Sequence, residues 1–400
     1  MNLSHRHGGT SIAWIPALLA LLAALATGCG GGLDPVLGSP AAADTTAPTV
    51  TATSPAAAVP PAPASTVCRT RSITTTFSEP MNPATITTAT FLVADDGTPV
   101  AGSVSYNVPT RVATFTPTAA SGWAANSTTL VATIKSGSTG VKDLAGNPLA
   151  SDRVFGFSSG PQACVASANL ATSAAYGAFG GAAGVTNQGV NTVVGGRLGT
   201  TAACTLVTGF HDAVNVYTET PLNKGATGGV DCGPPAPGTT ASLAAATQAR
   251  ADAQTAYNAL AALPPGSDPG AGQLGGLVLA PGVYTSASGT FDVTSGNLTL
   301  DAQGDSGAVW VFQTGAALTV GLTATPRSVL LVNGAQAANV FWQVGSAARI
   351  EDASTMVGTI IAPSGVTFST AGQTQQTTLI GRAISLTASV TLVNTTITAP

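Results

Sequence analysis

Charge is the property that this sequence lacks most. Only 8% of its 400 residues are Asp, Glu, Lys or Arg, against roughly 25% in an average soluble domain. The net charge is −4, and no clusters of Lys and Arg exist to bind phosphates, which argues against nucleic acid as a partner. Beyond about residue 30 no long uninterrupted apolar segment occurs, which argues against a polytopic membrane protein.

Catalytic and metal-binding side chains are scarce as well. His211 is the one histidine left once the N-terminal leader, with His5 and His7, is removed. No two cysteines have C-x-x-C spacing, so we predict no metal site and no cofactor. The best available carboxylates are Asp301, Asp305, Glu351 and Asp352. The first two flank a Gly-containing turn and the last two would face opposite ways in a strand, so we predict a protein that is not an enzyme.

The N-terminus indicates an export signal. Arg6 precedes an apolar run over 12–26 that is too short for a comfortable membrane span. The segment ends in Leu25-Ala26-Thr27-Gly28-Cys29, which resembles a bacterial lipobox. We therefore predict a lipoprotein signal peptide over 1–28 and a lipid on Cys29, the chain's only membrane link; ordinary signal cleavage with Cys29 incidental is the alternative. Gly30, by the same resemblance, favours the outer membrane or cell surface, with release outside the cell left open.

Residues 29–63 are rich in Gly, Pro, Ala, Ser and Thr and predict a flexible tether. The other cysteines are Cys68, Cys164, Cys204 and Cys232. Export makes disulfides the expected state, and four cysteines allow three pairings. We favour Cys204–Cys232 within the C-terminal region and Cys68–Cys164 between the first domain and the linker that follows it.

The first folded unit is predicted over 44–159, so that its start overlaps the tether. Short strand signals separated by turns, over about 100 residues, indicate an antiparallel β-sandwich. Asp44 to Val50, Phe77-Ser78-Glu79-Pro80-Met81 and Val141 to Asn147 resemble the motifs of a bacterial Ig-like family whose modules act as spacers. Asp143 and Asn147 have the residue types of calcium ligands, but a tight turn is the favoured interpretation. Residues 160–168 are a predicted linker.

The region 169–400 repeats an apolar–Thr–apolar pattern at intervals of roughly 20 residues, with near-continuous apolar runs between the copies. Such short, regularly recurring strands indicate a β-solenoid, in which each coil buries its apolar face on its neighbours. One helix is predicted at about 240–262. Thr239 or Thr240 is its N-cap, alanine fills its interior, and Pro264-Pro265-Gly266 ends it.

Several long segments of this region carry a family resemblance. They are Gly276 to Tyr284, Asn333-Gly334-Ala335, Asn339 to Gly345, Gly358 to Ala362, Leu379 to Ala383 and Val390-Thr391-Leu392. Together they resemble the ice-binding-like family. The resemblance implies a discontinuous β-solenoid of triangular cross-section flanked by one long α-helix, with coils contributed from both sides of that helix. It implies adsorption to ice crystals and no catalysis.

Outward-facing threonines are the candidate contact residues. We predict that Thr299, Thr319, Thr367 and Thr391 form one ladder, because each occupies the middle of an apolar–Thr–apolar copy. Threonine combines a hydroxyl that anchors water with a methyl group and a stiff β-branched side chain. The predicted function is a lipid-anchored, exported ice-binding protein that attaches the cell to ice or restrains ice growth and recrystallisation. The alternative is a surface adhesin that binds a polysaccharide or another cell.

Overall fold

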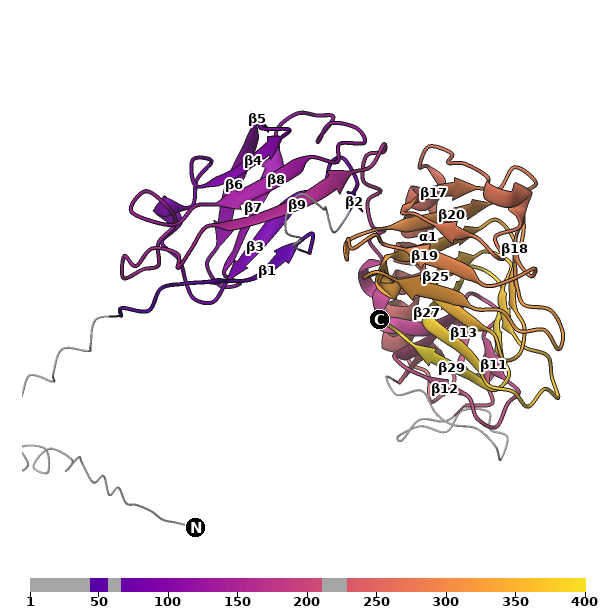
Figure 1. Cartoon of the computed structure of the whole chain (residues 1–400). Coiled ribbons are helices and arrows are strands. Elements are labelled where there is room, and N and C mark those ends of the chain that lie inside the picture. Colours follow the sequence, from indigo (N-terminus) through magenta and orange to yellow (C-terminus); the bar gives the residue numbers. More distant parts are fainter. Residues whose placement is uncertain (1–43, 57–65, 211–228) are drawn as a thin grey trace, which may run out of the picture. The chain divides into compact units, whose positions relative to one another are not determined.

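The computed structural model describes residues 44–56, 66–210 and 229–400. Two folded regions, each with a hydrophobic core of its own, occupy these ranges: a sandwich in the N-terminal part and a solenoid in the C-terminal part (Figure 1). The predicted signal peptide, Cys29 and His211 lie outside the described residues, as does the tether apart from 44–56. None of the helices in the described ranges combines the length and apolarity needed to cross a membrane.

The N-terminal region is a sandwich of two sheets. One sheet has the order β1-β3-β7-β6 and the other β2-β9-β8-β4-β5. The strands are β1 (Val50–Ser54), β2 (Thr66–Val67), β3 (Ile73–Phe77), β4 (Phe91–Asp95), β5 (Thr98–Pro99), β6 (Gly102–Asn107), β7 (Val112–Pro117), β8 (Leu130–Ile134) and β9 (Arg153–Ser159). The strands pair antiparallel except β2 and β9, which run parallel.

Alternation along the strands builds the sandwich core. In β3, Ile73 and Phe77 point inward while Thr74 and Thr76 are half-buried, as a period of two requires. Trp123 lies at the centre of this core, with its ring centroid 5.9 Å from that of Phe115. Aromatic burial of this kind supplies much of the hydrophobic stabilisation of a small sandwich.

The C-terminal region consists of coils whose strands form three parallel sheets. A ten-stranded sheet contains β10 (Tyr176–Gly180), β12 (Val193–Val194), β13 (Arg197–Ala203), β15 (Val230–Gly233), β17 (Gly282–Thr285), β20 (Trp310–Thr314), β23 (Val340–Val344), β25 (Thr355–Ala362), β27 (Thr377–Ser385) and β29 (Thr395–Thr398). A seven-stranded sheet contains β11 (Val185–Asn187), β14 (Val207–Thr208), β18 (Phe291–Val293), β21 (Leu318–Val320), β24 (Ala348–Ile350), β26 (Val366–Phe368) and β28 (Val390–Leu392). A three-stranded sheet contains β16 (Val278–Leu279), β19 (Leu298–Asp301) and β22 (Val329–Val332).

The coils do not follow one another in sequence order. β10 pairs with β27, β11 with β28 and β12 with β29, so the coils that precede the helix stack on the C-terminal end of the solenoid. Figure 1 shows this as magenta strands beside yellow ones. The solenoid is therefore discontinuous, and the predicted fold class, an Ig-like sandwich followed by a solenoid with one long helix, is confirmed.

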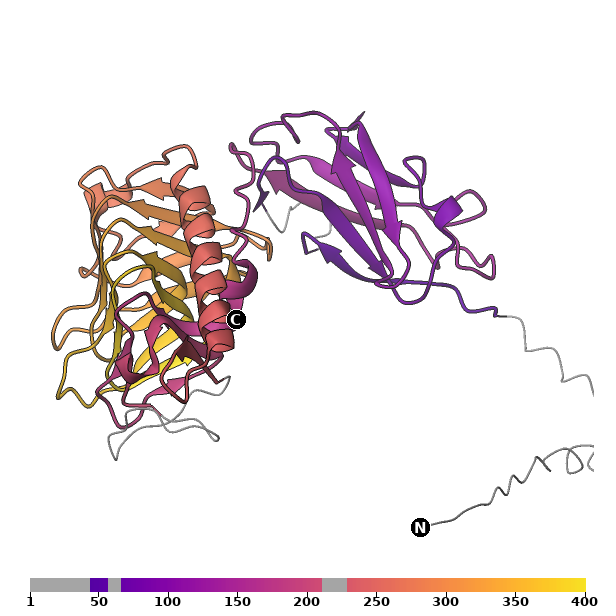
Figure 2. The same cartoon turned by 180° about the vertical axis from the view of Figure 1, so that it is seen from behind.

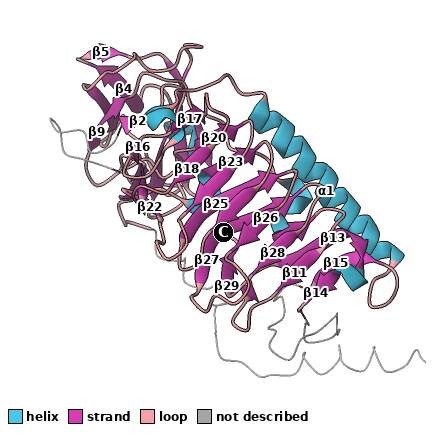
Figure 3. Cartoon of the chain, turned by 90° about the vertical axis from the view of Figure 1, so that its right-hand side faces the viewer, coloured by secondary structure: helices cyan, strands magenta, loops and turns pink. Residues whose placement is uncertain are grey.

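Helix α1 (Thr240–Ala261) runs along the solenoid (Figures 2 and 3). Thr239 is its N-cap, and a capping box joins Thr239 and Ser242 in both directions, so two otherwise unpaired backbone N–H groups of the first turn are satisfied. The buried helix face consists of small residues and one leucine: Ala246, Ala249, Ala253, Ala256 and Leu260. This stripe packs on outward residues of the ten-stranded sheet, among them Val311, Phe341 and Ile361. The part of that sheet under the helix is consequently buried on both faces.

Aromatic rings fill the interior of the coils. The ring centroids of Phe312 and Trp342 are 4.0 Å apart, and Tyr284 stacks on Phe312 at 5.4 Å. The indole Nε1–H of Trp342 donates to the Val357 carbonyl at 2.8 Å, and the Tyr284 hydroxyl donates to the Ala280 carbonyl at 2.6 Å. Burial raises the pKa of Tyr284 to about 12. The buried polar atoms of these rings are thus paired, which allows a rigid scaffold.

Candidate functional site

The seven-stranded sheet presents one regular outward surface. Its three-residue strands bury their first and third residues and leave the middle residue half-buried, as in Leu318-Thr319-Val320 and Val366-Thr367-Phe368. Parallel register aligns these middle residues across the sheet. From one end to the other the row reads Asp292, Thr319, Arg349, Thr367, Thr391, Thr186 and Thr208. We call this outward surface the threonine face.

Four threonines follow one another without interruption on the threonine face. They are Thr367, Thr391, Thr186 and Thr208. Adjacent strands lie about 4.8 Å apart, so the four side chains form a line about 14 Å long. The hydroxyl of Thr208 donates to that of Thr186 at 3.2 Å. β-branching restricts each side chain further, so the methyl and hydroxyl groups repeat at a fixed spacing.

Three of the four predicted contact residues lie on this row: Thr319, Thr367 and Thr391. Thr299 does not. It belongs to β19 in the three-stranded sheet, where its neighbours are Val278 and Leu330, which are 66% and 41% exposed. The prediction of one ladder is therefore wrong for Thr299. Strands of two different sheets share the apolar–Thr–apolar pattern, which fixes the outward direction of a side chain but not the sheet to which it belongs.

Thr186 and Thr208 are not among the contact residues predicted from the sequence. Both lie before the helix, in Val185-Thr186-Asn187 and Val207-Thr208. Each segment has an apolar residue before its threonine, but Asn187 or Gly209 follows it, so only half of the pattern of the later copies was available as a signal. Their place in the row follows from the parallel pairing of β11 with β28, which joins residues about 200 positions apart in sequence.

Arg349 interrupts the row between Thr319 and Thr367. Its Nε donates to Glu351 Oε1 at 2.8 Å and its Nη2 donates to Glu351 Oε2 at 3.1 Å. This hydrogen bonding raises the pKa of Arg349 above its ordinary value. The side chain of Arg349 is 37% exposed. A part-exposed ion pair therefore separates Thr319 from the other threonines.

Two disulfides join the cysteines of the described chain. They are Cys68–Cys164 and Cys204–Cys232, which is the pairing favoured from the sequence. Cys204 begins a short 3-10 helix immediately before β14, and Cys232 lies in β15. The second disulfide therefore holds together the end of the solenoid where the threonine row finishes.

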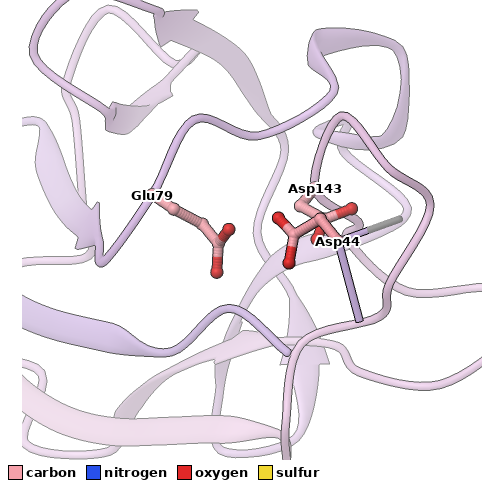
Figure 4. A group of neighbouring side chains, drawn as sticks. All are labelled: Asp44, Glu79 and Asp143. Carbon is pink, nitrogen blue, oxygen red and sulfur yellow. The ribbon is translucent and has the colours of Figure 1, made fainter. Parts of the chain in front are cut away.

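The carboxyl group of Asp143 belongs to a turn in the Ig-like region. It accepts hydrogen bonds from the backbone N–H of Asn147 at 2.8 Å and from its side-chain amide at 2.7 Å. Burial alone would raise the pKa of Asp143, but the hydrogen bonds from Asn147 hold it below its usual value. Figure 4 shows this carboxyl group together with those of Asp44 and Glu79. One oxygen atom from each of the three lies within 4.8 Å of the other two. The residues that resembled calcium ligands thus bond to each other.

Comparison with known proteins gives two family matches. The family described as ice-binding-like matches residues 179–398, and the bacterial Ig-like domain matches residues 44–159. An ice-binding protein of Nostoc sp. is 44% identical over 125 residues, which is 31% of this chain and 44% of that protein. Ice-binding protein 1 of Shewanella frigidimarina is 35% identical over 221 residues, which is 52% of this chain and 23% of that protein. The chain thus spans less than half the length of either relative.

A solved structure of the ice-binding protein 1 domain from Shewanella frigidimarina is also similar. It is 28% identical, has a TM-score of 0.49, and the match covers 58% of this chain and 97% of that structure.

Proposed function

Because this chain belongs to the ice-binding-like family, we propose that its solenoid adsorbs to ice and that the contact lies on the threonine face. One observation carries the proposal. Thr367, Thr391, Thr186 and Thr208 come from four consecutive coils and stand in a single register row. The relatives reported above are named as ice-binding proteins, which supports the same activity here.

The chemistry of the row suits a solid water surface. Each threonine hydroxyl can both donate and accept a hydrogen bond, so it anchors a water molecule at a fixed position. The adjacent methyl group disfavours contact with liquid water, because removing apolar surface from liquid water lowers the free energy. The repeat of about 4.8 Å between coils is held by the backbone ladder and not by flexible side chains. The row therefore presents water-anchoring groups whose conformational entropy was already lost on folding, so that ice binding does not have to restrict them again.

A pair of identical substitutions tests the face. Thr391→Tyr places a bulky ring in the middle of the row, whereas Thr299→Tyr places the same ring on an outward position of a different sheet. We expect Thr391→Tyr to lose most of the partitioning into growing ice and most of the thermal hysteresis, and Thr299→Tyr to keep both. If Thr299→Tyr is the inactive variant, the assignment of the contact to the threonine face is wrong. If the unsubstituted protein stays in the liquid, ice binding itself is wrong.

We propose further that the protein is exported and carries a lipid on Cys29, with the Ig-like domain acting as a spacer. Anchored in this way, the solenoid would hold a cell on ice; released, it would restrain ice growth and recrystallisation around the cell. The lipobox-like Leu25 to Cys29 supports the anchor. Incorporation of labelled palmitate into the wild type but not into Cys29→Ser is the expected result, and equal labelling of the two would contradict it.

We also propose that the protein is not an enzyme. Two of the candidate carboxylates are already engaged in structural contacts. Asp301 accepts hydrogen bonds from the backbone of Gln303 and the amide of Asn333, and Glu351 is paired with Arg349. Asp301 lies in the three-stranded sheet, while Glu351 follows a strand of the seven-stranded sheet. Incubation with polysaccharides should release no reducing ends above that of a boiled control.

A further inference from the structure

A groove opens beside the C-terminal end of α1, away from the threonine face. The outward side of β17, β20 and β23 forms its floor, with Thr285, Gln313 and Gln343. The last turn of the helix and the chain after it form the wall, with Tyr257, Pro264 and Pro265. Its volume, about 630 Å³, is within the range of small-molecule sites.

Two polar residues on the floor, Gln313 and Thr285, form hydrogen bonds at the end of the helix and with each other. Gln313 Nε2 donates to the carbonyls of Leu260 and Leu263, at 2.7 and 3.2 Å. Its Oε1 accepts from the Thr285 hydroxyl at 2.5 Å. Gln313 therefore ties the last turn of α1 and the chain just after it to the floor of the groove. These contacts explain why Gln313 is buried at this position.

Gln343 has no such explanation. It stands one coil further along, in register with Gln313, and is 7% exposed. Phe341, two residues earlier, packs towards α1, whereas Trp342 points into the solenoid, so Gln343 faces outward to the groove. Within 44–56, 66–210 and 229–400 its amide has no hydrogen-bond partner. The amide group is open to the groove, so its donor and its acceptor are available to a ligand there.

The lining defines the chemistry of the ligand. No charged side chain lines the groove, so an ionic ligand would lose its hydration without gaining a counter-charge. A primary amide offers a donor and an acceptor side by side, which matches two adjacent hydroxyl groups. The half-buried ring of Tyr257 and the two prolines offer an apolar surface next to that amide. We propose that this groove binds a neutral sugar unit of a polysaccharide, with hydroxyls on Gln343 and the apolar ring face against Tyr257.

Affinity electrophoresis of the whole protein tests this site, with gels that contain dextran, mannan or a soluble β-glucan. We expect at least one of these neutral polysaccharides to retard the protein. Gln343→Leu keeps the size of the side chain but removes the amide, and it should weaken retardation by about tenfold. Gln248→Leu, a matched change at an exposed position of α1, should leave it unchanged.

Tyr257→Ala provides a second variant in case Gln343→Leu fails to fold, and it should weaken retardation as well. Ice partitioning is measured on the same samples, and both groove variants should retain it, which separates this site from the threonine face. The proposal is overturned if no neutral polysaccharide retards the protein. It is equally overturned if only an acidic polysaccharide does, or if the folded groove variants bind like the wild type.

Discussion

Arg349 limits the length of the proposed ice-contact row, and replacing it gives the sharpest test of the threonine face. Arg349→Thr combined with Glu351→Ser removes the ion pair and joins Thr319 to the four threonines beyond it. The row would then run through six consecutive coils. At about 4.8 Å per coil, its length grows from about 14 Å to about 24 Å.

Both residues are changed together for a reason. Removing Arg349 alone would leave Glu351, whose side chain is 13% exposed, without its partner, and an unpaired, largely buried carboxylate is costly. Loss of the pair itself should cost little, because a part-exposed ion pair contributes about 0–1 kcal/mol. Threonine also suits a strand better than most residues do. The double variant should therefore fold with nearly the stability of the wild type.

Thermal hysteresis at equal molar concentration measures the gain. If adsorption scales with the length of the row, activity should rise by about 1.7-fold, the ratio of the two lengths. Arg153→Thr removes one positive charge from an exposed strand position of the Ig-like region and serves as the control, with no change expected. A folded double variant whose activity is unchanged or lower would refute the reasoning that the row is the contact surface and that charge limits it.

Three further predictions concern the packing of the solenoid, its disulfide and the pH dependence of its activity. Trp342→Ala removes a fully buried ring stacked on Phe312 and should lower the free energy of unfolding by about 3–5 kcal/mol in urea denaturation; a loss below about 1 kcal/mol would contradict the packing. Cys204→Ala with Cys232→Ala removes a disulfide between residues 28 positions apart and should lower the free energy of unfolding by about 3.5 kcal/mol by the loop-entropy relation. The measurement is the thermal midpoint of the solenoid, which should be lower than in the wild type, with Cys68–Cys164 kept in both proteins. Hysteresis should be constant between about pH 5 and pH 9, because threonine hydroxyls do not titrate there; a sigmoidal change would assign the contact to an ionisable group.

The fold could be predicted from the sequence because its signals are local. The period-two alternation in Ile73 to Phe77 and the repeated apolar–Thr–apolar copies both report which side chains face inward. The alanine-rich segment between Thr239 and Pro264 has a cap at one end and a helix breaker at the other, and α1 occupies it. Each of these features depends on residues only a few positions apart.

The composition of the site could be predicted only in part, because it depends on which coils become neighbours. Thr319, Thr367 and Thr391 share a sheet, but Thr299, with the same local pattern, belongs to another. Nothing within a few residues distinguishes these two environments. Assignment to a sheet follows from the path of the whole coil, including turns whose lengths differ from one coil to the next.

The same non-local order makes the threonine face dependent on both parts of the solenoid. Thr367 and Thr391 come from the end of the chain, and Thr186 and Thr208 from the segment before α1; the two pairs meet only where β28 pairs with β11. Neither segment alone holds more than two adjacent threonines of the uninterrupted row. The threonine row therefore forms only when the solenoid closes across the helix insertion, and the disulfide Cys204–Cys232 and the packing of α1 along the coils stabilise that closure. If the threonine face is the contact surface, the long helix, which packs on a different sheet, would contribute to ice binding by holding in register two halves of a row that the sequence keeps apart.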